Sequence, residues 1–141
     1  MLLPKKVKYR KWQNDRKSPA RLAAPDTRGI KLSFGSYGLK AMTSARVKSN
    51  QLEASRKVIV RTITKTGKMW IRIFPDRPYT QKGAQTPMGK GKGDLQGYVF
   101  EVRPGRIIFE VDGVDEKIAT EALRKAGAKL PLKTKIVKRA V

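Results

Sequence analysis

The sequence contains no cysteine and no histidine among its 141 residues. Disulfides, cysteine-based zinc sites and iron–sulfur clusters are therefore excluded, because each needs cysteine thiolates. Catalytic dyads and triads that depend on cysteine or histidine are excluded for the same reason. The lack of cysteine is also typical of a reducing compartment. The 11 acidic side chains could still do acid–base work, but no spacing among them singles out a pair, so we expect a non-enzymatic protein without metal or cofactor.

Long apolar runs are missing too, and acidic side chains are few. No apolar stretch approaches the roughly twenty residues that a membrane span needs. Pro4 and Lys5 stand where a signal peptide would be apolar, so no export signal is expected. The 33 basic residues outnumber the 11 acidic ones and give a net charge of +22. Such a chain repels itself unless an anionic partner lies against it, and the candidates are nucleic acid, an anionic membrane surface or an acidic protein.

The charge is concentrated in the first half, where residues 1–75 hold 19 basic and 3 acidic side chains. Within it, residues 1–30 show no sustained period of two or 3.6 residues and cannot bury enough apolar surface to become ordered alone. This segment is either a solvated tail or a basic arm that folds against RNA, with aromatic side chains that stack on bases. On the second interpretation, the candidate RNA-binding residues are Lys5, Lys6, Lys8, Tyr9, Arg10, Lys11, Trp12, Arg16, Lys17 and Arg21.

Residues 31–141 predict one domain of α+β class, with a mixed or antiparallel sheet and two helices. The alternating pattern at 30–34 predicts a half-buried strand, and a second short strand is expected at 37–42. A helix is expected over 50–66, with Asn50 as its N-cap and Glu53 as the capping partner. Its cationic face is either solvated or in contact with RNA, and the candidate residues there are Arg56, Lys57 and Arg61.

The rest of the chain predicts a strand at 69–74, a hairpin, a second helix and a final strand at 133–141. The hairpin would pair residues 98–102 with 107–111 around a turn at Pro104–Gly105. The second helix would begin at Asp115 or Asp112 and present an apolar face to the core. The long segment 75–97 between these elements is expected to be an extended functional loop. The predicted core residues are Leu52, Ile59, Ile63, Ile71, Ile107, Phe109, Ile118 and Leu123.

The stretch KGAQTPMGKGKGDLQG (82–97) at first suggests a nucleotide-binding loop. A P-loop needs four residues between its first glycine and a Gly-Lys-Ser/Thr sequence, whereas here five residues separate Gly83 from Gly89, and Lys90 precedes a glycine. The glycine spacing also differs from a dinucleotide fingerprint. The stretch is therefore either a disordered hairpin tip or a flexible cationic finger for RNA phosphates, because glycine permits close approach and lysine supplies charge.

Several blocks of the chain together resemble the bacterial large-subunit ribosomal protein sixteen family. They cover nearly the whole sequence in order: MLLPKKVKYRKW, KLSFGSYGLKA, MWIRIFPDRPYT, MGKGKG, PGRIIFEVDGV and AKLPLKTKIV. The resemblance implies an α+β domain that binds large-subunit ribosomal RNA near the peptidyl transferase centre. It also implies contact with A-site transfer RNA, with the P site as a second candidate, and a late-assembling component of the large subunit.

The resemblance further implies that Met88, Gly89, Lys90, Gly91, Lys92 and Gly93 lie near transfer RNA, and Lys82 of the same loop is a further candidate. Pro87 departs from the family, since many members have arginine there, so no function of that arginine is carried over. The arm between Trp12 and Ile30 is also a few residues longer than usual. Neighbouring ribosomal proteins are the other expected partners, without homo-oligomerisation, in cytoplasmic ribosomes or, alternatively, organellar ones.

Three other classes of protein explain less of the sequence. A nucleotide-using enzyme fits only the Gly-Lys loop, whose spacing fails. A membrane-active cationic protein would need a helix with bulky apolar residues opposite its cations, and the 50–66 helix uses its apolar face for the core. A DNA-binding protein is compatible with the charge, but the chain has no helix-turn-helix or basic-zipper pattern.

Overall fold

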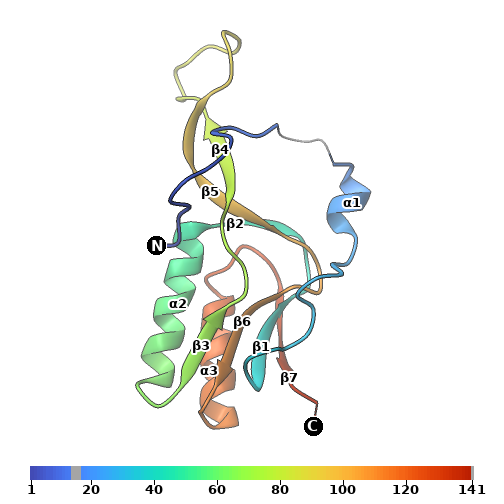
Figure 1. Ribbon diagram of the computed structural model, residues 1–141, viewed down its shortest axis with the longest axis vertical. Coiled ribbons are helices and arrows are strands. Elements are labelled where there is room, and N and C mark those ends of the chain that lie inside the picture. Colours follow the sequence, from blue (N-terminus) through green and yellow to red (C-terminus); the bar gives the residue numbers. More distant parts are fainter. Residues whose placement is uncertain (14–16, 141) are drawn as a thin grey trace.

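The structure, a computed structural model, describes residues 1–13 and 17–140. This part of the chain forms two antiparallel sheets, with strand orders β3-β6-β1-β7 and β2-β5-β4, together with three helices (Figure 1). The α+β prediction is confirmed. The elements are α1 (Pro19–Ala23), β1 (Tyr37–Ala41), β2 (Ala45–Lys48), α2 (Ser49–Ile63), β3 (Lys68–Ile71), β4 (Arg77–Gln81), β5 (Asp94–Val102), β6 (Ile107–Asp112), α3 (Glu116–Gly127) and β7 (Thr134–Lys138).

The four-stranded sheet and the helices α2 and α3 form the body of the protein, and the core lies between the sheet and these helices. Its central strand β6 is buried along almost its whole length, and Phe109 is fully buried. The Ser55 hydroxyl of α2 donates to the Ala126 carbonyl of α3 at 3.1 Å, so the two helices are joined by a buried hydrogen bond. Of the predicted core residues, Leu52, Ile59, Ile63, Ile107, Phe109 and Leu123 are buried.

Two of the predicted core positions are wrong. Ile118 on α3 is 39% exposed, whereas Ala119, Ala122, Leu123 and Ala126 are fully buried. At 100° per residue, Ile118 lies about a quarter-turn away from the centre of that stripe, so it points past the core. Ile71 packs against the core but is only half-buried.

Helix α2 begins slightly earlier than the sequence suggests. Lys48 is the N-cap residue, and its backbone N–H donates to the Gln51 side-chain oxygen at 2.9 Å, so neither Asn50 nor Glu53 performs the predicted capping role. The helix ends at Ile63, and the next residue, Thr64, has a φ of 58°. The predicted extension to residue 66 is therefore wrong at its last turn.

The predicted hairpin around Pro104–Gly105 does not form, because its two strands belong to different sheets. The turn bonds to the end of β1 instead: the Gly105 N–H donates to the Ala41 carbonyl at 2.7 Å, and the Ala41 N–H donates to the Arg106 carbonyl at 2.8 Å. These bonds redirect the chain from β5, in the three-stranded sheet (the upper sheet), to β6, in the four-stranded sheet of the body. The pattern at 98–111 identified two strands correctly but not their partners.

Strands β4 and β5 form a long hairpin within the segment predicted as a loop. Gln81 pairs with Asp94 at its upper end, so only residues 82–93 form the tip. Pro78 lies inside β4, which the sheet tolerates because β4 is an edge strand. The hairpin and its tip extend well beyond the body (Figure 1). The sequence pattern also missed β2 and the short helix α1.

Residues 30–34 were predicted to form a strand but cross the sheet as an irregular segment. The fully buried Glu110 carboxylate accepts hydrogen bonds from the backbone N–H groups of Ser33, Phe34 and Gly35, at 3.1, 2.6 and 2.7 Å. A side chain therefore satisfies the backbone groups that a strand would have paired. Burial alone would raise the Glu110 pKa, but these N–H groups and the paired Arg72 outweigh it and hold that pKa below its usual value.

Candidate nucleic-acid interface

The N-terminal arm is attached to the hairpin rather than free in solvent. Figure 1 shows residues 1–13 crossing beside β4 and β5 and the short helix α1 standing on the other side of the upper sheet. The Arg77 guanidinium of β4 lies 5.6 Å from the centroid of the Trp12 ring and donates to the Gln13 carbonyl at 3.3 Å. One β4 side chain thus holds both the ring and the backbone of the arm.

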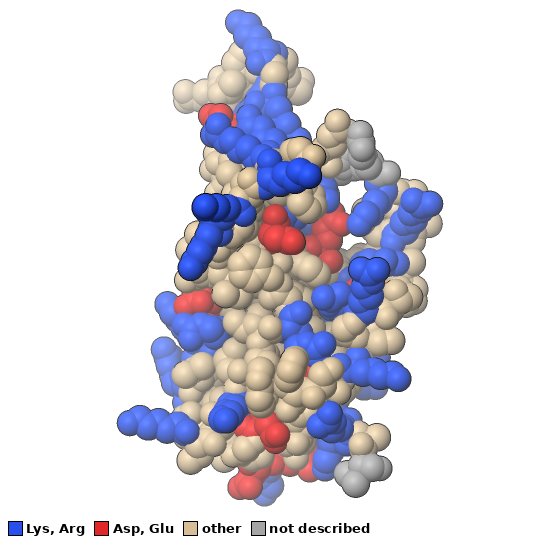
Figure 2. All heavy atoms as spheres, viewed as in Figure 1, with Lys and Arg blue, Asp and Glu red and all other residues tan. Residues whose placement is uncertain are grey.

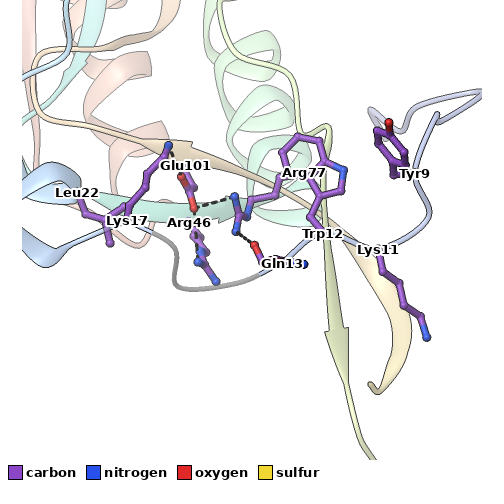
Figure 3. A pocket seen from close by; sticks show the side chains of 9 residues that line it. All are labelled: Tyr9, Lys11, Trp12, Gln13, Lys17, Leu22, Arg46, Arg77 and Glu101. Atoms are coloured by element: carbon purple, nitrogen blue, oxygen red, sulfur yellow. Dashed lines mark hydrogen bonds and ion pairs between the residues drawn. The ribbon is translucent and has the colours of Figure 1, made fainter. Parts of the chain in front are cut away.

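The carboxylate of Glu101 on β5 is the centre of the polar contacts behind the arm. It lies 3.3 Å from the Lys17 ammonium of the arm, 3.4 Å from the Arg46 guanidinium of β2 and 3.3 Å from the Arg77 guanidinium of β4 (Figure 3). Three cations around one carboxylate leave a local excess of two positive charges. Because Glu101 is largely shielded from solvent, salt screens these ion pairs less, and they hold the three cations in place beside the arm.

A cavity of about 570 Å³ lies between the arm and the upper sheet, and Figure 3 shows the side chains around it. Trp12 is 39% exposed at this cavity, and Leu22 of α1 provides apolar surface at the other end. A flat aromatic ring beside cations is the composition that binds unstacked bases and their phosphates. The lining residues are Tyr9, Lys11, Trp12, Gln13, Lys17, Leu22, Arg46, Arg77 and Glu101.

The last part of the arm is fastened to the body. The Arg103 guanidinium donates to the carbonyls of Ala24 and Pro25 at 3.0 and 3.2 Å. The Asp26 N–H donates to the Pro104 carbonyl at 2.8 Å, and the Ile107 N–H donates to the Gly29 carbonyl at 2.8 Å. Residues 24–30 therefore belong structurally to the domain, although the sequence pattern grouped them with the arm.

The hairpin tip is open and cationic. Cβ atoms added to Gly89 or Gly91 would meet nothing within 4 Å, and both residues have φ near 100°. Met88 is 97% exposed. The Lys82 ammonium donates to the Gly89 carbonyl within the tip, and the Lys92 ammonium donates to the Trp12 carbonyl of the arm. The tip and the arm are therefore joined to each other.

The structure brings some of the predicted RNA-binding residues together and separates others. The arm residues and the tip meet along the hairpin, whereas Arg56, Lys57 and Arg61 lie on α2, at the flank of the body (Figure 1). The Arg56 guanidinium donates hydrogen bonds to both oxygens of the Glu53 carboxylate, at 3.0 and 2.5 Å. This hydrogen bonding lowers the Glu53 pKa to about 2, so the carboxylate stays charged and offsets Arg56. Arg16 lies outside the described residues.

Sequence reasoning missed Arg46 and Arg77, which complete the cavity. Arg77 stands between Asp76 and Pro78 in the segment predicted as a loop, and its only signal was the short alternation that follows Pro75. In Figure 2, blue side chains run along the hairpin and the flanks, whereas red ones form small groups at the base of the hairpin, on one flank and at the lower end. None of the described helices has the length and apolar composition needed to cross a bilayer.

Comparison with known proteins gives a consistent result. The family model for ribosomal protein L16p/L10e matches residues 4–137. The large ribosomal subunit protein uL16 of Thermosipho africanus is 52% identical over 139 residues, covering 99% of this chain and 94% of the relative. The proteins of the same name from Pseudothermotoga lettingae and Thermosipho melanesiensis are each 49% identical, with 99% of this chain covered and 95% and 94% of the relative, respectively.

Proposed function

The chain belongs to the ribosomal protein L16p/L10e family, and from this membership we propose that its arm and hairpin together grip ribosomal RNA while the hairpin tip reaches transfer RNA. The coarser function follows from the family: the protein is a structural, non-enzymatic component of the large ribosomal subunit, with ribosomal RNA and other ribosomal proteins as partners. The contacts to particular RNA groups are the proposal.

One observation carries the proposal for ribosomal RNA. The Trp12 ring lies against the Arg77 guanidinium, and the backbone carbonyl of Trp12 accepts a hydrogen bond from the Lys92 ammonium. The arm and the tip therefore form one unit with a shared positive surface. Each arm cation can neutralise a phosphate, and Trp12 and Tyr9 offer rings for stacking. The candidate RNA-binding residues of the arm and of α2 remain those predicted from the sequence, with Arg46 and Arg77 added.

The test for this contact uses the full-length protein and protein-free large-subunit ribosomal RNA. Arg77→Ala removes the side chain beneath Trp12, and we expect weaker binding and a shallower dependence of affinity on salt. Lys117→Ala is the matched control, because Lys117 is an exposed cation on α3, away from the arm. Equal affinities and equal salt slopes for the two variants would refute the proposed arm–hairpin interface.

The proposal for transfer RNA, near the peptidyl transferase centre, rests on the tip. Among the described residues Lys90 has no hydrogen-bond or ion-pair partner, and the flanking Gly89 and Gly91 leave space around it. A tip of this kind suits phosphates of a ligand that comes and goes, because it imposes no sequence requirement. The A site is the expected position, with the P site as the alternative, and one copy of the protein is expected to act in each subunit.

Filter binding of transfer RNA to purified ribosomes that carry Lys90→Glu tests the tip. We expect normal incorporation of this variant and weakened A-site binding, because an anion beside RNA phosphates is repelled within a screening length of about 10 Å at 0.1 M salt. Lys117→Glu makes the same charge change on α3 and should leave binding unchanged. Normal A-site and P-site occupancy with fully incorporated Lys90→Glu protein would show that the tip does not act on transfer RNA.

A further inference from the structure

A second aromatic surface lies on the body, away from the arm and the hairpin tip. The rings of Phe34 and Trp70 are stacked with centroids 5.9 Å apart and planes inclined by 19°. Atoms in van der Waals contact are about 3.5–4.0 Å apart, so this centroid distance means that the rings are strongly offset. An offset pair presents more flat aromatic surface than a face-to-face pair. Phe34 is 55% exposed, and Trp70 is half-buried.

The exposed Phe34 ring is held in place by a buried polar cluster. The Glu110 carboxylate, fully buried, accepts from the Phe34 N–H and from the N–H groups on both sides of it, and it pairs with the Arg72 guanidinium. Arg72 also lies 5.2 Å from the Phe34 ring centroid and donates to the Lys31 carbonyl at 3.3 Å. A fully buried carboxylate thus fixes a segment whose aromatic side chain is left in solvent.

The segment cannot easily move on the sheet. A Cβ atom added to Gly35 would lie 2.7 Å from the Val111 carbonyl oxygen, so the backbone rests directly on β6 at this point. Trp70 stands opposite Glu110 in the β3–β6 register and therefore shares its side of the sheet. The geometry of the pair is consequently set before any ligand arrives, and a preorganised site loses less conformational entropy on binding.

Several basic residues are neighbours of this aromatic pair, either along the chain or through a hydrogen-bonded carbonyl. Lys68 is two residues before Trp70 on β3, so both side chains leave the same side of the sheet. The Arg139 guanidinium donates to the Ser33 carbonyl at 3.3 Å, next to Phe34. With Lys31 and Arg72 there are four basic residues against the two acids Glu110 and Asp112, a local net charge of +2.

We propose that the Phe34–Trp70 pair is a platform on which an unpaired base of ribosomal RNA stacks, while Lys31, Lys68 and Arg139 hold the neighbouring phosphates. Lysine is depleted at protein–protein interfaces, whereas aromatic rings beside lysines and arginines are the composition that binds single-stranded nucleic acid. The inference rests on the proposed function in ribosomal RNA binding and adds a second contact on the opposite side of the sheet from α2 and α3.

Binding of full-length variants to protein-free large-subunit ribosomal RNA tests the platform. Phe34→Leu keeps an apolar side chain but removes the aromatic face, and we expect affinity to fall about 5- to 140-fold, the range that one stacked base supplies. The salt slope should not change, because no charge is removed. Phe34→Tyr should retain the wild-type affinity, and Ile118→Ala, an exposed apolar side chain on α3, should behave like wild type. Equal affinities for Leu and wild type would overturn the proposal.

Ultraviolet cross-linking of intact large subunits provides an independent reading. After trypsin digestion, a nucleotide adduct is expected on the peptide 32–40 at Phe34 or on the peptide 69–72 at Trp70, because zero-length cross-links form only between stacked or touching groups. Adducts confined to the arm and the tip would refute the platform while leaving the proposed function intact. Failure of the wild-type protein to bind the RNA at all would instead refute the proposed function.

Discussion

The body and the hairpin–arm unit of this protein are stabilised by different interactions. In the body, Leu39, Phe109 and Leu123 are fully buried between a four-stranded sheet and two helices. In the hairpin–arm unit, contacts are made mainly by charged side chains on carbonyls, rings and one carboxylate, as at Arg77 and Glu101. The hairpin tip beyond Gln81 and Asp94 buries almost nothing.

This difference matters for function because the two kinds of interaction respond differently to RNA. A buried apolar core is complete without a partner, whereas a cluster of cations repels itself and is stabilised when phosphates arrive. The hairpin–arm unit is thus expected to gain stability on the ribosome. The body supplies the rigid base from which the hairpin projects (Figure 1). Variants in the two regions should therefore separate folding from binding.

The largest expected effect is on the body, at Glu110. Glu110→Ala should lower the free energy of unfolding by about 3–5 kcal/mol, because it leaves Arg72 and three backbone N–H groups without their acceptor. Urea denaturation of the full-length variant measures this loss. As a control, Glu116→Ala removes an exposed carboxylate from α3 and should change stability by less than about 0.5 kcal/mol. Similar small losses for both variants would show that the buried cluster contributes little.

The same carboxylate predicts a pH dependence of stability. The folded-state pKa of Glu110 lies below its ordinary value of 4.5. Its contribution is therefore fully present above about pH 4.5 and is lost as the pH falls through the lowered folded-state pKa. Thermal melting between pH 7 and pH 3 should show a steeper acid loss for wild type than for Glu110→Gln, whose side chain does not titrate. Parallel curves for the two proteins would contradict the role assigned to this group.

A smaller effect is expected from the packing of α3. Leu123→Ala should destabilise by roughly 2–5 kcal/mol because the side chain is fully buried, whereas Ile118→Ala should cost less than about 0.5 kcal/mol. The two residues lie five positions apart in one helix, so the two variants compare the stability loss at a buried and at an exposed apolar side chain of the same helix. Chemical denaturation of both variants gives the comparison. A loss at Ile118 equal to that at Leu123 would mean that the exposed side of α3 is covered in solution.

The elements that the sequence predicted correctly are those in which local pattern and tertiary environment agree. The stripe around Leu123 and the long apolar pattern of α2 repeat at helical spacing, and both helices form. The errors arise where a distant residue decides the outcome. Segment 30–34 alternates like a strand, but the Glu110 carboxylate takes its N–H groups, and the turn at Gly105 bonds to β1 instead of closing a hairpin.

The candidate site was predictable only in part, for the same reason. The cations and rings of the arm were visible in composition, and so was the Gly-Lys tip. The arm and the tip are brought together because Arg77 and Lys92 contact Trp12. These two residues lie 65 and 80 positions after Trp12 in the chain, so no local pattern could reveal the contacts. A hairpin containing Pro78 is not recognisable by pattern, because the proline suggests an interruption unless the strand is known to be at an edge.

In the hairpin–arm unit, removal of residues 1–12 is expected to weaken RNA binding without unfolding the body. The deletion removes the five cations Lys5, Lys6, Lys8, Arg10 and Lys11, so the log–log salt slope should fall by at most roughly 3.5–4.5, if each cation contacts a phosphate. The melting temperature should be nearly unchanged. The boundary matters, because residues 24–30 are bonded to the body and a longer deletion would confuse the two effects.

Trp12→Ala is the matched variant for that truncation. It keeps every arm cation and should lower affinity while leaving the salt slope as in wild type, because stacking is not ionic. An unchanged slope in the truncated protein would show that the arm cations do not contact phosphates. An unchanged affinity in Trp12→Ala would limit the arm to an electrostatic role.

The smallest expected effect on folding comes from removal of the hairpin tip. Gln81 and Asp94 stand opposite each other in the last pair of the β4–β5 ladder, so a two-residue Asn-Gly turn can replace residues 82–93 and close the strands directly. Shortening the loop from twelve residues to two favours folding by at most about 1.6 kcal/mol of closure entropy. The bond from Lys92 to the Trp12 carbonyl is lost, but that contact is exposed and worth little. The free energy of unfolding should therefore stay the same or rise slightly, while transfer RNA binding by ribosomes carrying the variant falls. A loss of stability greater than about 1 kcal/mol would show that the tip also stabilises the fold. The division of roles between a stabilising body and a binding hairpin tip would then be wrong.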